Sequence, residues 1–200
     1  MFIKICGITN TQDALDAVAF GADALGFLFA ESPRKISTDA VREIVNQLPS
    51  NILTIGVFRD QDSRHVIDTV HEAGLVGAQL HGHESRAQVA EVSAEVRWVA
   101  KSVIAGSAEA SSSNSYGTEM VLVDSAHPGT GTGYDLALLE QLPKALKVIL
   151  SGGLTVANVA DSIRAVSPWG VDVSSGVEIS PGIKDRIKLR DFITNARAVR

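Results

Sequence analysis

The stretch FIKICGITNTQDALDAVAFGADALGFLF, residues 2–29, contains one complete unit of the pattern that decides the fold. Two apolar runs, Phe2–Cys6 and Ala24–Phe29, flank a segment in which apolar side chains recur with the period of a helix. Apolar runs without alternation are typical of strands that are buried on both faces of a parallel sheet. The stretch therefore predicts a strand–helix–strand unit with parallel strands.

The same alternation of strand and helix patterns continues to the end of the chain. We expect eight strands, at Phe2–Cys6, Ala24–Phe29, Leu53–Phe58, Gly77–Leu80, Trp98–Val103, Met120–Val123, Val148–Leu150 and Val171–Val173. Eight strand–helix units of about 25 residues each predict an α/β protein with a closed (β/α)8 TIM barrel. Residues 1–200 would form a single domain, and a doubly wound open sheet is the alternative architecture.

The segments between these strands predict amphipathic helices. Apolar faces are expected at Ala14, Leu15, Val18 and Ala19, at Val66, Ile67 and Val70, and at Val156, Val159, Ala160 and Ile163. Thr11 and Thr155 are expected to cap the N-termini of two of these helices. The serine-rich segment 106–117 gives the weakest helix pattern and is compatible with a loop.

Composition excludes several classes of function. The 200 residues are 45% hydrophobic and carry a net charge of -5, without a run of Lys and Arg. Binding to nucleic acid or to an anionic membrane needs a clustered basic face, so we expect neither. The single cysteine, Cys6, cannot form an intramolecular disulfide, which fits a reducing cytoplasm. The sequence has neither a signal-peptide pattern nor an apolar run long enough to span a bilayer.

The predicted barrel implies where an active site would lie. In such barrels the site is formed just after the C-terminal ends of the strands. Cys6, His81, Asp124 and the turn 151–153 all follow predicted strands, whereas Asp172 lies inside the eighth. We therefore expect these side chains to converge at one end of the barrel.

Two glycine-containing turns predict a phosphate site. Ser151-Gly152-Gly153-Leu154 follows the seventh predicted strand, and Ser174-Ser175-Gly176 follows the eighth. Glycine lets backbone N–H groups approach an anion, and loops after strands seven and eight commonly hold a phosphate in this fold. Each turn alone is better explained as a tight connection, but the two together at these positions favour phosphate.

Cys6 and Asp124 are candidates for proton transfer. A lone cysteine at a strand end is commonly an inert core residue. Here Gly7 leaves space beside it, and Lys4 faces the same side of the strand, so a neighbouring cation could lower the pKa of the thiol and make it a base. Asp124 is either a solvated loop carboxylate or a general acid. An acid and a base across one barrel mouth suit an isomerisation.

Two further features have competing explanations. Arg34, in the loop after the second predicted strand, could grip a substrate carboxylate with its fork or simply be solvated. His81-Gly82-His83 suggests a metal site, but the remaining histidines have no matching spacing: His65, His71 and His127. Because a zinc site needs three or four protein ligands, we expect no metal.

Several of these segments, taken in order, resemble the phosphoribosylanthranilate isomerase family. The resemblance spans nearly the whole chain, and its first and last motifs are specific. The matching segments are Lys4–Asn10, Gly21–Phe27, Ser32–Ser37, Gly56–Phe58, Gln79–Gly82, Asp124, Gly129–Gly131, Leu150–Leu154 and Val171–Glu178. One departure is Tyr134-Asp135-Leu136, where the family often has Phe-Asp-Trp.

The resemblance implies an aldose–ketose isomerase of tryptophan biosynthesis. The reaction is the Amadori rearrangement of N-(5-phosphoribosyl)anthranilate to 1-(2-carboxyphenylamino)-1-deoxyribulose 5-phosphate. By similarity, Asp124 would protonate the ring oxygen, Cys6 would remove the proton from the sugar C2, and Arg34 would hold the anthranilate carboxylate. His81 and Asp172 would lie in the substrate pocket. The phosphate would be held by the two turns, at Gly152, Gly153, Ser174, Ser175 and Gly176.

The same resemblance implies a small phosphosugar substrate and no cofactor or metal. Two alternatives remain: another phosphosugar epimerase or lyase, or a barrel that binds a phosphosugar without turning it over. An aldolase-like lyase would need a Schiff-base lysine, for which Lys4 and Lys101 are candidates by position. The sequence does not decide the oligomeric state, and a monomer is the favoured expectation.

Overall fold

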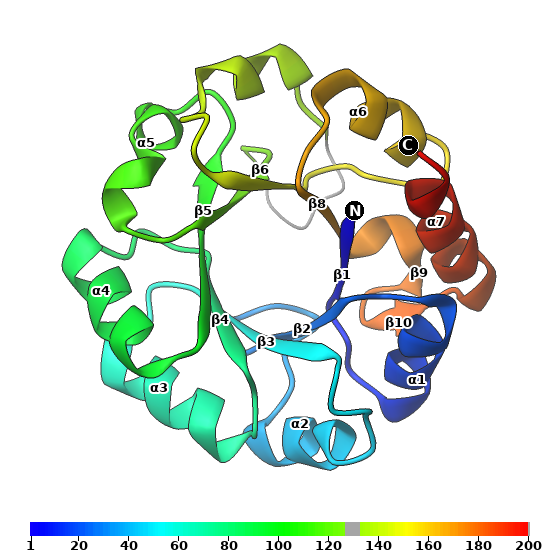
Figure 1. The fold of residues 1–200 in the computed structure, drawn as a ribbon. Coiled ribbons are helices and arrows are strands. Elements are labelled where there is room, and N and C mark those ends of the chain that lie inside the picture. Colours follow the sequence, from blue (N-terminus) through cyan, green and yellow to red (C-terminus); the bar gives the residue numbers. More distant parts are fainter. Residues whose placement is uncertain (127–132, 200) are drawn as a thin grey trace.

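A computed structural model describes residues 1–126 and 133–199 of the chain. Its centre is a closed barrel of eight parallel strands, in which each strand pairs with the next and β8 pairs back to β1 (Figure 1). This closure confirms the (β/α)8 prediction and excludes the open sheet. The strands are β1 Phe2–Cys6, β2 Ala24–Leu28, β3 Leu53–Phe58, β4 Gly77–Leu80, β5 Trp98–Ile104, β6 Met120–Asp124, β7 Lys147–Leu150 and β8 Gly170–Val173.

Helices surround the barrel and bury their apolar faces against it (Figure 1). After β8 the chain first forms a short hairpin of β9 (Glu178–Ser180) and β10 (Ile183–Lys184) before the last helix. The helices are α1 Thr11–Phe20, α2 Thr38–Val45, α3 Ser63–Glu72, α4 Arg86–Glu95, α5 Ala108–Ser111, α6 Val159–Val166 and α7 Arg186–Ala198. Short 3-10 turns are η1 Ser113–Tyr116, η2 Leu136–Gln141 and η3 Ser175–Val177.

Two of the eight units have reduced helices. The segment after β5 contains only the four-residue α5 followed by η1, as its weak helix pattern predicted. Serine hydroxyls there bond local backbone groups, which competes with helix formation. After β6 the described chain forms the 3-10 turn η2, which ends at Gln141, and the extended Leu142 then precedes Pro143.

Helix α1 buries a face that only partly matches the predicted one: Ala14 is buried and Val18 packs against the core, but Leu15 and Ala19 are exposed. Leu15 is 38% exposed, whereas Asp13 and Ala17 are buried. The pattern of apolar residues was misleading because Asp13 is satisfied inside the protein, where its carboxylate accepts the side-chain N–H of Asn10 and the backbone N–H of Lys184. The predicted face of α3 is confirmed, since Val66, Ile67 and Val70 are all buried.

The two predicted helix caps were also wrong. Asn10, not Thr11, caps α1 by accepting the N–H of Asp13. Helix α6 begins only at Val159, and the Asn158 side chain accepts the N–H of Thr155 and donates to the carbonyl of Gly153. The asparagine amide therefore fixes the turn that leads from β7 into α6.

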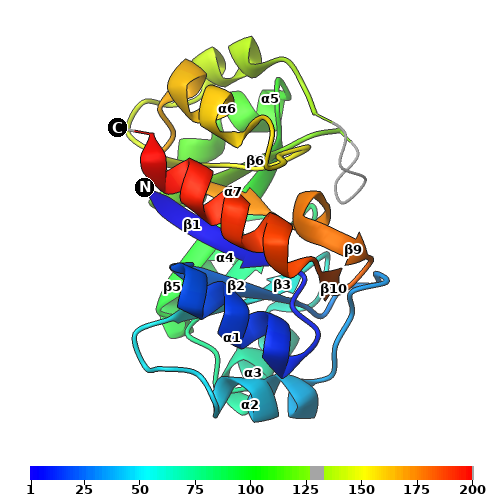
Figure 2. The ribbon, with the colours of Figure 1, turned by 90° about the vertical axis from the view of Figure 1, so that its right-hand side faces the viewer.

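The chain ends meet on one side of the barrel (Figure 2). The Arg197 guanidinium in α7 donates to the carbonyl of Met1 at 2.6 Å and to the carboxylate of Asp23 at 2.7 Å. Helix α7 also packs against α1 and α6. Within residues 1–126 and 133–199, no helix combines the length and hydropathy needed to cross a membrane.

Candidate active site

A pocket opens at the C-terminal ends of the barrel strands, and it brings together most of the predicted site residues. Gly176 alone among them is not part of the lining formed by the described residues. The predicted residues that line the pocket are Cys6, Arg34, His81, Asp124, Gly152, Gly153, Asp172, Ser174 and Ser175. His127 and the segment 129–131, which the sequence analysis also singled out, lie outside the described residues.

The first wall of the pocket carries the Cys6 thiol at the end of β1. Lys4 and Asp172 are directly paired positions of β1 and β8, and the Lys4 ammonium donates to Asp172 at 2.8 Å. Gly26 on β2 leaves room for both side chains, because a Cβ there would lie 2.8 Å from the Cys6 sulfur and 3.1 Å from the Lys4 nitrogen. The thiol and the ammonium are therefore close neighbours.

The expected lowering of the Cys6 pKa is wrong. Burial raises the pKa of the thiol, and the nearby Asp172 carboxylate adds to this effect. Lys4 and Lys184 act in the opposite direction but do not outweigh burial. For Lys4 the balance is reversed: burial disfavours its charge, yet Asp172 and Cys6 raise its pKa. The thiol thus lies next to an ammonium group that stays charged.

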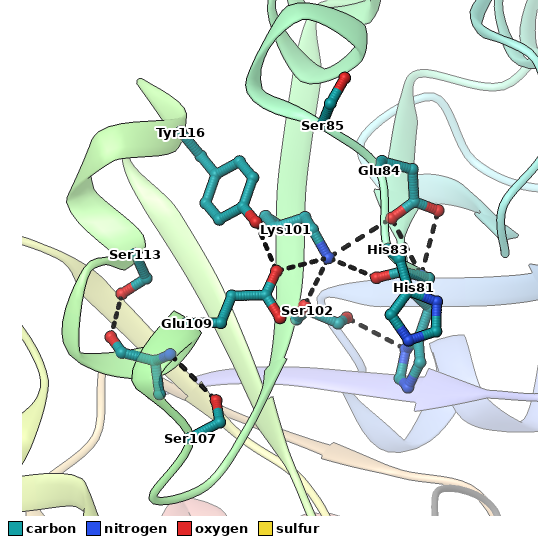
Figure 3. Close-up of polar contacts among 12 residues, drawn as sticks. His81, His83, Glu84, Ser85, Lys101, Ser102, Ser107, Glu109, Ser113 and Tyr116 are labelled. Carbon is teal, nitrogen blue, oxygen red and sulfur yellow. Dashed lines mark hydrogen bonds and ion pairs between the residues drawn. The ribbon is translucent and has the colours of Figure 1, made fainter.

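Asp124, at the end of β6, forms a second reactive wall with His81. One Asp124 carboxylate oxygen accepts the N–H of Ser125 at 2.7 Å, and the other lies 3.5 Å from His81 Nε2. His81 Nδ1 lies 2.7 Å from Gln79 Nε2 and 3.0 Å from Ser102 Oγ, a contact visible in Figure 3. If Gln79 donates here, Nδ1 is the acceptor and Nε2 carries the proton that faces Asp124.

The two predicted anion-binding turns lie together above β7 and β8. Gly152 and Gly153 have φ of +83° and +71°, a conformation that glycine adopts without strain. Among the described residues, the backbone N–H groups of Gly152, Gly153 and Ser174 donate to no protein acceptor. The buried Ser174 hydroxyl likewise has no partner there. Such a set of donors is suited to an anion.

Gly176 has a structural role beside this set. A Cβ at Gly176 would lie only 1.9 Å from the carbonyl oxygen of Leu154. The glycine therefore allows the turn after β8 to pack directly against the turn after β7.

Arg34 reaches the pocket wall, but one edge of its guanidinium is already occupied. Nε and Nη2 donate to the two carboxylate oxygens of Glu178 at 2.9 and 2.7 Å. Glu178 also accepts from the buried Lys184 ammonium at 2.9 Å. Arg34 therefore does use its fork, toward a carboxylate of the protein itself.

The lysines considered for a Schiff base do not reach the pocket. Within the described residues, neither Lys4 nor Lys101 is part of the lining. Lys101 lies in a separate buried cluster, where it donates to the carbonyls of Gly82 and Ser102 and lies 3.4 Å from Glu84 and 3.5 Å from Glu109 (Figure 3). This arrangement disfavours an aldolase-like lyase.

The same cluster fixes the loop that carries His81. The Glu84 carboxylate accepts N–H groups from Asp60 and Gly82, and so joins the loops after β3 and β4. His83 is exposed and pairs with Asp60 instead of facing the pocket with His81. Among the residues that the structure describes, no group of three or more His, Cys, Asp and Glu is placed to hold a metal ion.

Sequence reasoning assigned no role to Gln79, Glu178 or Lys184. Gln79 is a polar residue inside a buried strand, which is a signal that could have been noticed. Glu178 and Lys184 each adjoin an exposed isoleucine, and nothing local predicts the burial of these two charged side chains. Glu178 meets Arg34 across 144 positions of sequence, which only the closed barrel makes possible.

Comparisons with known proteins agree with this geometry. A family model described as N-(5'phosphoribosyl)anthranilate (PRA) isomerase matches residues 3–195. A protein from Bacillus cereus (strain G9842) named N-(5'-phosphoribosyl)anthranilate isomerase is 39% identical over 203 residues, covering 98% of each chain.

Solved structures give the same result. A phosphoribosyl anthranilate isomerase from Thermus thermophilus covers 100% of both chains with a TM-score of 0.92 and 36% identity. Another, in complex with reduced 1-(o-carboxyphenylamino)-1-deoxyribulose 5-phosphate, covers 98% of both chains with a TM-score of 0.85 and 35% identity.

Proposed function

Because the chain belongs to the N-(5'-phosphoribosyl)anthranilate isomerase family, we propose that its pocket carries out that family's Amadori rearrangement with Cys6 as the general base and Asp124 as the general acid. The activity is that of an aldose–ketose isomerase of tryptophan biosynthesis, acting on a small phosphosugar. The observation that carries the assignment of roles is that the Cys6 thiol and the Asp124 carboxyl group line a single pocket, together with backbone donors that bond to no described residue.

The reaction begins with opening of the ribose ring. Asp124 gives its proton to the ring oxygen, the bond between that oxygen and C1 breaks, and the anilino nitrogen lone pair forms the C1=N bond. His81 faces the same carboxyl group at 3.5 Å and can support it during this transfer. Both groups are largely shielded from water, which strengthens their mutual interaction.

The second step removes the C2 proton. The Cys6 thiolate accepts it, and the electrons of the C–H bond form a C1=C2 double bond while the C=N pair returns to nitrogen. The resulting enol then gains a proton at C1 and loses one from its C2 hydroxyl, which gives the ketose. Lys4 stabilises the thiolate form of the base, because its ammonium lies beside the sulfur.

The substrate has an anionic group at each end, and the pocket offers a place for both. The phosphate would lie against Gly152, Gly153, Ser174 and Ser175, which line the pocket. The anthranilate carboxylate would lie against Arg34. Gripping both ends orients C2 and the ring oxygen toward the two reactive groups, and no step uses a cofactor or metal.

Membership of the family also underlies our expectations on the substrate, the domain organisation and the cellular location. A small-molecule substrate fits the pocket, and we expect residues 1–200 to work as one domain in the cytoplasm. A monomer remains our prediction for the oligomeric state.

Turnover by the purified chain tests the activity. Phosphoribosylanthranilate is generated in situ, and loss of its fluorescence is followed with and without a metal chelator. We expect rapid loss that the chelator leaves unchanged. Loss at the background rate would refute the activity, and binding of the phosphosugar without turnover would indicate the non-catalytic alternative. Trapping with borohydride and a sugar phosphate is expected to leave Lys4 and Lys101 unmodified, whereas an adduct on either lysine would indicate a lyase.

A further inference from the structure

A cluster of buried charges lies behind the pocket wall and takes no part in the proton transfers above. Glu178 and Lys184 are directly paired positions of the β9–β10 hairpin, and both side chains are almost completely buried. Arg34 reaches the same carboxylate from the loop after β2. Three charged groups from two distant segments are thus gathered at one point.

The cluster contains two cations and one carboxylate. Burial opposes the charge of Glu178, but the hydrogen bonds of Arg34 and the charge of Lys184 outweigh it and lower the Glu178 pKa. The carboxylate is therefore ionised and shared between two positive groups. Burial lowers the pKa of Lys184, whereas the hydrogen bonds to Glu178 raise the pKa of Arg34, and Arg34 is the member of the cluster that lines the pocket.

The geometry decides which part of Arg34 faces the substrate. Glu178 occupies the edge of the guanidinium formed by Nε and Nη2. The edge formed by Nη1 and the second N–H of Nη2 makes no hydrogen bond to any described residue. A guanidinium offers five N–H donors in a rigid plane, so fixing one edge also fixes the direction of the other.

The surroundings of Arg34 leave it little freedom. Gly7, with φ of +76°, lies against its aliphatic stem, since a Cβ at Gly7 would lie 2.7 Å from Arg34 Cδ. The Ser32 hydroxyl accepts the Arg34 backbone N–H at 3.1 Å. The Lys184 ammonium in turn ties the hairpin to the carbonyl of Cys6 at 2.6 Å. The position of the guanidinium is thereby linked to the strand end that carries the thiol.

We propose that Glu178, anchored by Lys184, is a positioning residue that aims the open edge of Arg34 into the pocket and so makes the site selective for substrates with a carboxylate on the aromatic ring. This inference builds on the proposed function and adds the origin of its substrate selectivity. A purely structural role for the ion pair predicts instead that its loss weakens all ligands alike.

Binding of two matched ligands separates these possibilities. One is reduced 1-(o-carboxyphenylamino)-1-deoxyribulose 5-phosphate, and the other is its counterpart without the ring carboxylate. The wild-type chain should bind the first about 10- to 100-fold more tightly, as expected for charge-assisted hydrogen bonds. Glu178→Gln should reduce this preference by about tenfold while changing the Kd of the counterpart by less than about threefold. For turnover by Glu178→Gln, KM should rise by a larger factor than kcat falls.

Three further variants keep the test decisive. Arg34→Lys retains the charge but loses the planar fork, so it should also lose the preference. Glu178→Asp retains the charge but shortens the side chain. It replaces Glu178→Gln in the binding test if thermal melting shows that Glu178→Gln does not fold. Arg59→Gln removes another cation of the pocket lining and should leave the preference within about threefold of wild type.

The outcomes are distinct. An unchanged preference in Glu178→Gln, an equal loss for both ligands, or a preference that depends on Arg59 would each overturn the inference while leaving the isomerase activity intact. Failure of the wild-type chain to bind either ligand would refute the proposed function itself, and the inference with it.

Discussion

Two features of the surroundings of Cys6 act in opposite directions on the protonation of its thiol. Burial favours its neutral form, and the adjacent Lys4 ammonium favours the thiolate. Since Cys6 is the only cysteine, thiolate absorbance near 240 nm and alkylation by iodoacetamide both report on this residue alone. We predict that the thiol titrates above its ordinary value of 9.0 and that Lys4→Met moves the titration further upward. Titration below 9.0 in the ligand-free protein would contradict this account.

The raised pKa also has a consequence for stability. A proton that is held more tightly in the folded state stabilises that state fully below the unfolded value, here 9.0, and this contribution is lost as pH rises through the higher native value. The unfolding free energy should therefore fall above about pH 9, and Cys6→Ala should show a shallower fall. Because Cys6 also raises the pKa of Lys4 and acts in the same direction on Lys184, the difference between the two proteins reports on the thiol together with these two lysines.

At this scale the sequence predicts positions better than interactions. Cys6, His81 and Asp124 were predicted for the pocket because a strand end determines where a side chain lies in a barrel. The pairing of Arg34 with Glu178 could not be predicted, since the two residues are 144 positions apart and neither has a local pattern that indicates burial.

Among the elements, the two turns after β7 and β8 depend on each other. Gly176 leaves no room for a side chain, because a Cβ would lie 1.9 Å from the Leu154 carbonyl oxygen. We predict that Gly176→Ala forces the turns apart and destabilises the protein by about 1–3 kcal/mol, as overpacking generally does. Thermal melting measures the loss of stability. A higher Kd for inorganic phosphate would report the displacement of the anion site.

Gly133→Ala is the matched control for this variant. No atom of a described residue lies within 4 Å of a Cβ built at Gly133, so the melting temperature of Gly133→Ala should stay close to that of wild type. If Gly176→Ala also melts like wild type and binds phosphate equally well, the contact between the turns does not shape the site.

Elements also show where sequence patterns are ambiguous. The strand positions were predicted within one residue at each end, because a buried parallel strand is a short and continuous apolar run. The buried face of α1 was only partly predicted, because buried Asp13 is stabilised by Lys184 of β10 and by the Asn10 side chain, which the periodicity of α1 does not reveal.

For the whole molecule, closure of the barrel is what creates the site. Pairing of β1 with β8 brings Cys6 of the first strand beside Asp172 of the last, and α7 fastens the two chain ends together (Figure 2). The chain carries a net charge of -5, yet its substrate is anionic. Buried cations and backbone donors at the mouth of the barrel provide a local site for the anionic groups of the substrate. The net charge of the whole chain therefore does not determine which ligand binds.

The central claim is that Cys6 and Asp124 divide the proton transfers of one pocket. It is tested most directly by measuring kcat/KM for phosphoribosylanthranilate in wild type, Cys6→Ser and Asp124→Asn, together with the Kd of reduced 1-(o-carboxyphenylamino)-1-deoxyribulose 5-phosphate. We predict a loss of at least about a hundredfold in kcat/KM for each variant, with Kd within about threefold of wild type. Turnover near the wild-type rate in either variant, or a loss of binding as large as the loss of turnover, would contradict the claim.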